Sequence, residues 1–202
     1  MTNYLSPIGT ALLILSLSSL NTFAHAHHLN TPVATQAPSS QSLYNLDSVW
    51  QNQNGENVQL SSLRGKVVVL AMAYTSCQSS CPVIVDAMEK LEQQIKDPGA
   101  AQFVLASFDS KRDVPVQLKK YATQKKLKLD HWTLLHGDQK AVRNLSATLG
   151  IRYKEDSQGE FDHSNIISLL DKDGVIRFQQ VGINKDSKEL TQKLLELAKS
   201  RP

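Results

Sequence analysis

Cysteine is scarce in this sequence of 202 residues, which contains only Cys77 and Cys81. A single pair of thiols excludes a small scaffold that is held together by several disulfides. A chain of this length can bury a hydrophobic core without such bonds. The pair therefore needs its own explanation, and a structural disulfide, a redox-active dithiol and a site for a soft metal are the alternatives.

Neither positive nor negative charge is in large excess. Lys and Arg number 22 and Asp and Glu number 19, which gives a net charge of +3. The late basic residues are interspersed with acidic ones, so no basic patch of the kind that binds nucleic acid is predicted. The sequence has no internal repeat, and we expect a monomer.

Charged side chains are absent from the first 26 residues. Within them residues 8–20 form an apolar run of 13, which is short for a bilayer span and typical of a signal-peptide core. The small residues Ala24 and Ala26 predict cleavage after Ala26. An uncleaved inner-membrane anchor is the alternative, because the segment before the apolar run lacks Lys and Arg. Both alternatives export the domain to an oxidising compartment, the periplasm.

The next segment, residues 27–42, is rich in Ser, Thr, Pro, Ala and Gln and poor in large apolar side chains. Such a segment cannot bury enough surface to offset the entropy lost on ordering, so a disordered linker is predicted. His27 and His28 would begin the mature chain, and a polar tail is favoured there over an auxiliary site for divalent copper. The folded domain is expected to span residues 43–202.

Apolar runs and amphipathic stretches alternate in this domain. The predicted strands are residues 66–74, 102–108, 131–136, 166–170 and 175–181, of which the last two form a hairpin around Asp171–Gly174. The predicted helices start at Pro82, at Asp113 with Pro115 in the first turn, at Asp138, and at Asp186. This order predicts an α/β domain with a mixed central sheet flanked by helices and a C-terminal hairpin and helix.

The cysteine pair lies where the first long strand ends and a helix begins. Sites in open α/β sheets collect at such strand ends. A helix N-terminus stabilises a thiolate and lowers the pKa of the thiol, and the spacing of Cys77 and Cys81 places the sulfurs on one helix face. Two converging thiolates form a soft site that favours monovalent copper over hard cations.

A third ligand is expected because two are few for a stable metal site. His163 is the leading candidate, and the adjacent Asp162 could orient its imidazole. An imidazole beside two thiolates would let the site hold divalent as well as monovalent copper. The alternative is a surface or packed histidine, which is the interpretation favoured for His131 and His136.

Several short motifs accompany the pair in a fixed order. They are Gly65–Val69, Tyr74–Pro82, Phe108-Asp109, Arg112–Pro115, Asp162–Ser164 and Leu170–Gly174. On these motifs the sequence resembles the Sco/SenC family over roughly residues 43–199. The resemblance implies a thioredoxin-like fold and copper, Cu(I) or Cu(II), bound by Cys77, Cys81 and His163. It also implies a metallochaperone that delivers copper to the binuclear copper (CuA) site of cytochrome c oxidase. The implied partner is the copper-site subunit of the oxidase or another copper chaperone.

The main alternative is a thiol-disulfide oxidoreductase with few partners, in which Cys77 and Cys81 reduce the copper-ligand cysteines of the oxidase subunit. Two absences weigh against a general oxidoreductase. Three residues, not two, separate the cysteines, and no proline occurs between Val116 and Arg201, where thioredoxin-type enzymes place a cis-proline. A peroxidase is a weaker alternative, because it would leave His163 without a role.

The sequence departs from the family at residues 108–110, Phe-Asp-Ser, where many members have Val-Asp-Pro. Asp109 is therefore expected either to form a turn or to approach the cysteine loop and tune it. Tyr74 and Trp132 are expected to be core or rim aromatics.

Overall fold

The computed structural model describes residues 40–77, 80–182 and 187–199. The predicted signal peptide, most of the predicted linker with His27 and His28, and the predicted N-cap Asp186 lie outside the described residues. Ser42, the last residue of the predicted linker, is buried and forms a backbone bridge with Val175. The packed domain therefore includes Ser42, one residue before the predicted start at residue 43.

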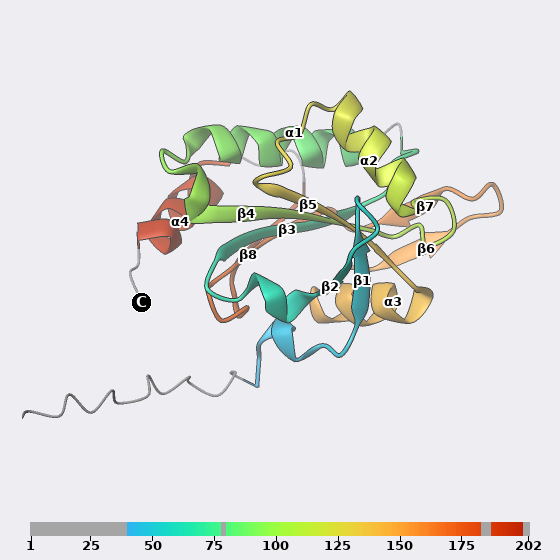
Figure 1. Ribbon diagram of the computed structural model, residues 1–202, viewed down its shortest axis with the longest axis horizontal. Coiled ribbons are helices and arrows are strands. Elements are labelled where there is room, and N and C mark those ends of the chain that lie inside the picture. Colours follow the sequence, from blue (N-terminus) through green and yellow to red (C-terminus); the bar gives the residue numbers. More distant parts are fainter. Residues whose placement is uncertain (1–39, 78–79, 183–186, 200–202) are drawn as a thin grey trace, which may run out of the picture. The chain divides into compact units, whose positions relative to one another are not determined.

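A seven-stranded mixed sheet forms the centre of the domain (Figure 1). Its order is β2 (Asn57–Gln59), β1 (Val49–Asn52), β5 (Trp132–Gly137), β4 (Ala101–Ser107), β3 (Val67–Ala73), β8 (Ile166–Leu170) and β9 (Ile176–Val181). Strands β3, β4 and β5 are parallel, whereas β1, β8 and β9 pair antiparallel with their neighbours. Every residue of β3 and β4 is buried, as expected for central strands covered on both faces.

The α-helices of the described residues are α1 (Ser80–Gln94), α2 (Pro115–Gln124), α3 (Gln139–Thr148) and α4 (Lys188–Lys199). Short 3-10 helices occupy Leu43–Asn45, Leu60–Leu63 and Pro98–Ala100. Helices α1 and α2 cover one face of the sheet and α3 covers the other (Figure 1). Helix α1 buries Ile84, Met88 and Leu91, which belong to the predicted apolar stripe, and it begins two residues before the predicted start at Pro82.

The predicted α/β class and mixed central sheet are confirmed, but two hairpins were not predicted. One is β1–β2 at the sheet edge. The other joins β6 (Tyr153–Glu155) and β7 (Phe161–His163), which form a separate two-stranded sheet. Their strands have only three or four residues and are largely polar and partly exposed, so they lack the apolar period that identifies the central strands.

Two of the predicted helix caps can be compared with the structure. Asp138 caps α3, because its side chain accepts a hydrogen bond of 2.7 Å from the backbone N–H of Ala141. The prediction that Asp113 caps α2 is wrong. Val114 is the N-cap and makes no side-chain cap, since the carboxylate of Asp113 is engaged by β4 and the cysteine loop, as described below.

Gly174 closes the turn between β8 and β9 with a φ of +79°, and a Cβ there would lie 2.6 Å from the ring of Tyr44. Gly174→Ala is expected to lower the free energy of unfolding by about 2–4 kcal/mol, because left-handed strain and overpacking add. Urea denaturation measures this loss.

The matched control is Gly182→Ala. Gly182 has a φ of +90° with open space around it, so its loss of about 1–2 kcal/mol reflects the backbone alone. Equal losses in the two variants would contradict the packing contribution of Tyr44.

Candidate metal centre

The two cysteines lie on the segment that connects β3 to α1. Cys77 belongs to the loop before the helix, so the prediction that both thiols share one helix face is wrong. They converge because the loop folds back, and the backbone N–H of Cys81 donates a hydrogen bond of 3.4 Å to Cys77 Sγ. Cys77 is 7% exposed and Cys81 1% exposed, and no disulfide joins them. The two cysteine side chains are therefore adjacent and withdrawn from solvent.

His163 is the last residue of β7 and faces the thiols from the separate hairpin. Its Nε2 lies 3.4 Å from Cys81 Sγ and 3.4 Å from Ser80 Oγ. Its Nδ1 lies 3.3 Å from the carbonyl oxygen of Ser164. An Nδ1–H that donates to this carbonyl leaves the lone pair of Nε2 directed at the thiols.

Asp162 does not orient the imidazole, and that prediction is wrong. Successive side chains of a strand point to opposite sides, so Asp162 faces away from His163. It is exposed and lies opposite Lys154 of β6. The backbone carbonyl of Ser164 takes the place that the sequence assigned to this carboxylate.

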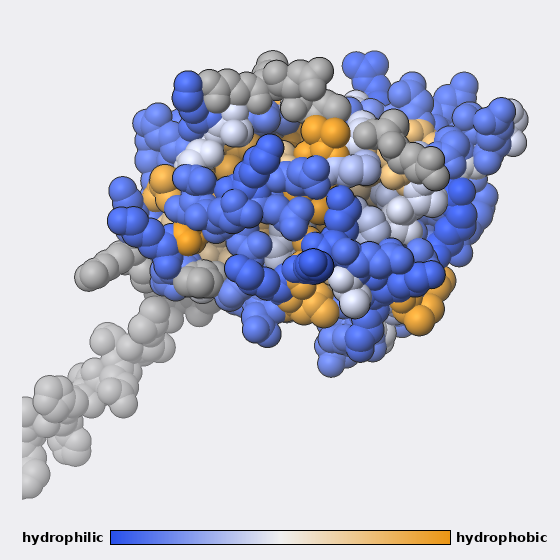
Figure 2. Space-filling model, turned by 90° about the horizontal axis from the view of Figure 1, so that it is seen from above, coloured by the Kyte–Doolittle hydropathy of each residue, from blue (hydrophilic) through white to orange (hydrophobic). Residues whose placement is uncertain are grey.

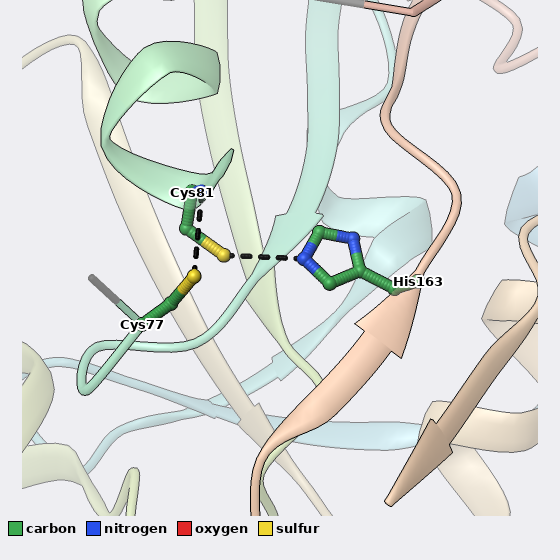
Figure 3. Close-up of side chains that lie close together, drawn as sticks. All are labelled: Cys77, Cys81 and His163. Carbon is green, nitrogen blue, oxygen red and sulfur yellow. Dashed lines mark hydrogen bonds between the residues drawn. The ribbon is translucent and has the colours of Figure 1, made fainter. Parts of the chain in front are cut away.

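Cys77, Cys81 and His163 together form a compact donor set. One ligand atom of each lies within 4.8 Å of the other two, and the three side chains point toward one another (Figure 3). Within the described part of the chain, no other three His, Cys, Asp or Glu residues come together in this way. His136 lies on β5 and His131 directly precedes it. Neither belongs to this donor set.

The donor set fits a soft metal ion. Two ligand atoms at about 2.0 and 2.3 Å from one ion lie roughly 3.5 Å apart at tetrahedral angles, and the 3.4 Å between Cys81 Sγ and His163 Nε2 is close to that separation. Two sulfurs and one imidazole with no carboxylate favour copper or zinc over hard cations such as magnesium or calcium.

Burial governs the protonation of the metal-free site. It raises the pKa of the Cys81 thiol well above its ordinary value, and the nearby Cys77 and Asp113 act in the same direction. The expectation that the helix N-terminus lowers this pKa is therefore wrong for Cys81. The metal-free thiol keeps its proton at neutral pH.

Aromatic rings and one open hollow define access to the site. The ring of Phe108 lies 4.9 Å from the imidazole and that of Tyr74 lies 6.2 Å from it, measured between centroids. On the outer side His163 lines a hollow of about 310 Å³ together with Arg152 and Lys154. The imidazole is thus reached from solvent, whereas the thiols lie behind it.

Asp113 is a site residue that the sequence did not identify as one. It is fully buried. Its carboxylate accepts hydrogen bonds from the backbone N–H of Thr75 at 2.9 Å, the hydroxyl of Thr75 at 2.5 Å and the hydroxyl of Ser107 at 2.5 Å. These bonds tie the start of the cysteine loop to the end of β4. The only signal in the sequence was the Arg112-Asp113 motif of the family resemblance.

Asp109 forms a turn, which was one of its two predicted roles. Its Oδ1 accepts hydrogen bonds from the backbone N–H groups of Lys111 and Arg112 at 3.1 and 2.9 Å. Its Oδ2 binds the Nε of Arg112. Asp109 is buried, and its bonds go to this turn and not to the thiols.

No helix in the described ranges combines the length and the apolar character needed to cross a lipid bilayer. The apolar run at residues 8–20 lies outside these ranges.

Comparisons with known proteins give concordant matches. A family model described as SCO1/SenC matches residues 37–199. The SCO1 protein homolog of Bacillus subtilis is 30% identical over 131 residues, which cover 63% of this chain and 68% of the relative. The chain spans 63% of the length of two further curated relatives.

Two solved structures resemble the domain. BsSco, described as a member of the Sco family of cytochrome c oxidase assembly proteins with a disulfide switch, has a TM-score of 0.66 and 25% identity over 76% of this chain and 92% of that chain. ScoI of Bradyrhizobium japonicum with copper bound has a TM-score of 0.63 and 24% identity over 74% of this chain and 96% of that chain, which shows the shared fold. These matches confirm the predicted thioredoxin-like fold.

Proposed function

The chain belongs to the SCO1/SenC family, and we propose that it is a metallochaperone that binds copper and delivers it to the CuA site of cytochrome c oxidase. One observation carries the proposal: Cys77, Cys81 and His163, from a loop, a helix and a separate hairpin, converge on one point. The copper-bound structure of the Bradyrhizobium japonicum relative supports copper as the cargo.

Capture of copper uses the two thiols first. The thiolates of Cys77 and Cys81 bind Cu(I), and Nε2 of His163 completes a three-coordinate site. Copper has to displace the thiol proton of Cys81, whose pKa is raised by burial. Uptake therefore releases protons, and the apparent affinity falls as the pH is lowered.

Release occurs by ligand exchange with a partner's cysteines. The incoming thiolate replaces His163 first, because the imidazole borders the open hollow while Cys77 and Cys81 are buried. The two thiolates of the chaperone then leave the ion in turn. Apart from the thiol protons, which the chaperone loses on uptake and regains on release, no covalent bond of either protein is broken, so this cycle is a transfer and not a catalysed reaction.

The family and the N-terminal sequence support a proposal for the partner and the location. We place the protein in the periplasm, exported by residues 1–26 or anchored by them, with the copper-site subunit of the oxidase or another copper chaperone as its partner. The face formed by α1 and α2 is mostly hydrophilic, with apolar surface only in small patches (Figure 2). Exposed Val83, Val114 and Val116 lie at the starts of these helices. Such a surface favours short-lived contacts by a monomer over a permanent interface.

Metal analysis of the reduced, full-length protein tests the proposal. We expect one Cu(I) per chain, with an X-ray absorption spectrum that shows two sulfur donors and one nitrogen donor. After oxidation of the cysteine pair to a disulfide, binding should be lost, because the metal needs thiolates. A reduced protein that binds no copper, or binds it without sulfur, would refute the chaperone function.

The second candidate function is reduction of the oxidase's copper-ligand cysteines. The closeness of the two cysteines favours it, since the backbone N–H of Cys81 donates a hydrogen bond to Cys77 Sγ. Insulin reduction without copper tests whether the cysteine pair acts as a general oxidoreductase. Robust turnover would favour a general oxidoreductase. The chaperone should give little turnover, because both thiols are buried and burial raises the pKa of the Cys81 thiol.

A further inference from the structure

The two halves of the donor set are carried by different parts of the fold. The cysteine loop continues from β3 of the central sheet, whereas His163 ends β7 of the two-stranded sheet. In the described residues, β6 and β7 pair only with each other. After His163 the chain runs through Ser164 and Asn165 into β8, which pairs with β3. This pairing brings the imidazole near the cysteine loop, and the side-chain contacts of the hairpin then set its position.

One short turn, residues 109–113 between β4 and α2, contacts both halves. On one side it holds the cysteine loop through Asp113, whose carboxylate receives two hydrogen bonds from Thr75. Thr75 stands two residues before Cys77. A fully buried carboxylate with three donors is a strong and directional anchor.

On its other side the turn holds the hairpin through Arg112. The guanidinium is fixed by Asp109, donates to the carbonyl oxygen of Gly159 and lies 3.9 Å from the carboxylate of Glu160. Gly159 and Glu160 belong to the connection between β6 and β7. The planar fork of arginine bridges these groups with several donors at once, which lysine cannot reproduce.

Tyr74 connects the cysteine loop directly to the hairpin. It precedes Thr75 in the cysteine loop, its hydroxyl donates to Glu160 at 2.8 Å, and it accepts from the backbone N–H of Phe161 at 3.3 Å. The guanidinium carbon of Arg112 lies 5.9 Å from the centroid of its ring. Glu160 thus contacts both the cysteine loop and the 109–113 turn. It lies three residues before His163.

We propose that the 109–113 turn sets the distance between the thiols and the imidazole, with Arg112 as the positioning residue for His163 and Asp113 as the positioning residue for the cysteine loop. The inference rests on the proposed copper site. Neither side chain is a ligand, and each acts through the backbone that it holds.

The turn has two arms: Arg112, which holds the hairpin, and Asp113, which holds the cysteine loop. We expect the two arms to affect the binding of Cu(I) and Cu(II) differently. Cu(I) is satisfied by two thiolates, whereas Cu(II) prefers a nitrogen donor as well. Loosening the hairpin should therefore weaken Cu(II) binding and spare Cu(I). Loosening the cysteine loop should weaken both.

Arg112→Gln tests the arm that holds the hairpin. We expect Cu(II) affinity to fall about 10-fold, as for groups that orient metal ligands indirectly, with Cu(I) affinity close to that of the wild type. The nitrogen hyperfine splitting in the Cu(II) electron paramagnetic resonance spectrum should weaken. The matched control is Arg177→Gln, which removes another Nε–Asp ion pair of 2.6 Å on β9 and should leave both affinities and the spectrum unchanged.

Asp113→Asn tests the other arm and should weaken Cu(I) and Cu(II) together. Thr75→Val removes only one of the three donors to Asp113. It is the variant to use if the Asp113→Asn protein does not fold. The inference is overturned if Arg112→Gln keeps the wild-type Cu(II) affinity and spectrum, or if it loses Cu(I) and Cu(II) equally along with thermal stability. Failure of the wild-type protein to bind copper would instead overturn the proposed function.

Discussion

Cys81→Ser is expected to abolish tight binding of Cu(I), with a loss of affinity on the order of 1,000-fold or more. Structural zinc sites in zinc-finger peptides bind their metal with about 10–16 kcal/mol of apparent free energy, which shows how much thiolate and imidazole ligands can contribute, and Cys81 supplies one of the two sulfurs here. A serine hydroxyl is a hard donor that stays protonated at neutral pH, so it cannot replace a thiolate for a soft ion. Competition with a chromophoric Cu(I) chelator under anaerobic conditions measures the loss.

The fold should survive this replacement, because serine is nearly isosteric with cysteine. Thermal unfolding of the metal-free variant is the control, and its midpoint should stay near that of the wild type. Retention of wild-type Cu(I) affinity would show that Cys81 is not a ligand. The variant also removes the dithiol, so it tests the site and not the choice between chaperone and reductant.

His163→Ala is expected to separate the two oxidation states. The remaining pair, Cys77 and Cys81, should keep most of its hold on Cu(I), whereas affinity for Cu(II) should fall by about 100-fold because the nitrogen donor is gone. Anaerobic titration with each ion measures the two affinities, and the thiolate-to-Cu(II) charge-transfer absorption reports the altered ligand set.

The matched control is His131→Ala. His131 precedes β5 and lies outside the donor set, so its replacement should leave both affinities unchanged. If the His163→Ala protein bound Cu(II) as tightly as the wild type, the assignment of His163 as a ligand would be wrong.

The sequence predicts the centre of the fold well because local pattern and burial agree there. The valine run of β3 and the apolar stripe of α1 reflect contacts with one continuous core, and both are confirmed. Asp138 caps a helix by reaching three residues along the chain, which is a local event that sequence reveals.

The site was predicted less completely because its supports are distant in sequence. Asp113 looks like a helix cap in the local sequence, but Thr75, 38 residues earlier, takes its carboxylate. The direction of the Asp162 side chain depends on β7 being a strand. A segment of three partly exposed residues has no pattern that predicts a strand. His163 was found through the chemical need for a third donor and the family resemblance, not through any local pattern.

The separate pairing of β6 and β7 has an energetic consequence. Regions of a protein that share few backbone hydrogen bonds open with different free energies, and β6 and β7 share no strand pairing with the central sheet in the described residues. The hairpin that carries the nitrogen donor should therefore open at a lower free energy than β3 and β4. Local melting of the short hairpin would remove the imidazole while the buried strands β3 and β4 stay intact. At the proposed copper site, the relative affinity for Cu(I) and Cu(II) should then depend on the stability of this small peripheral hairpin.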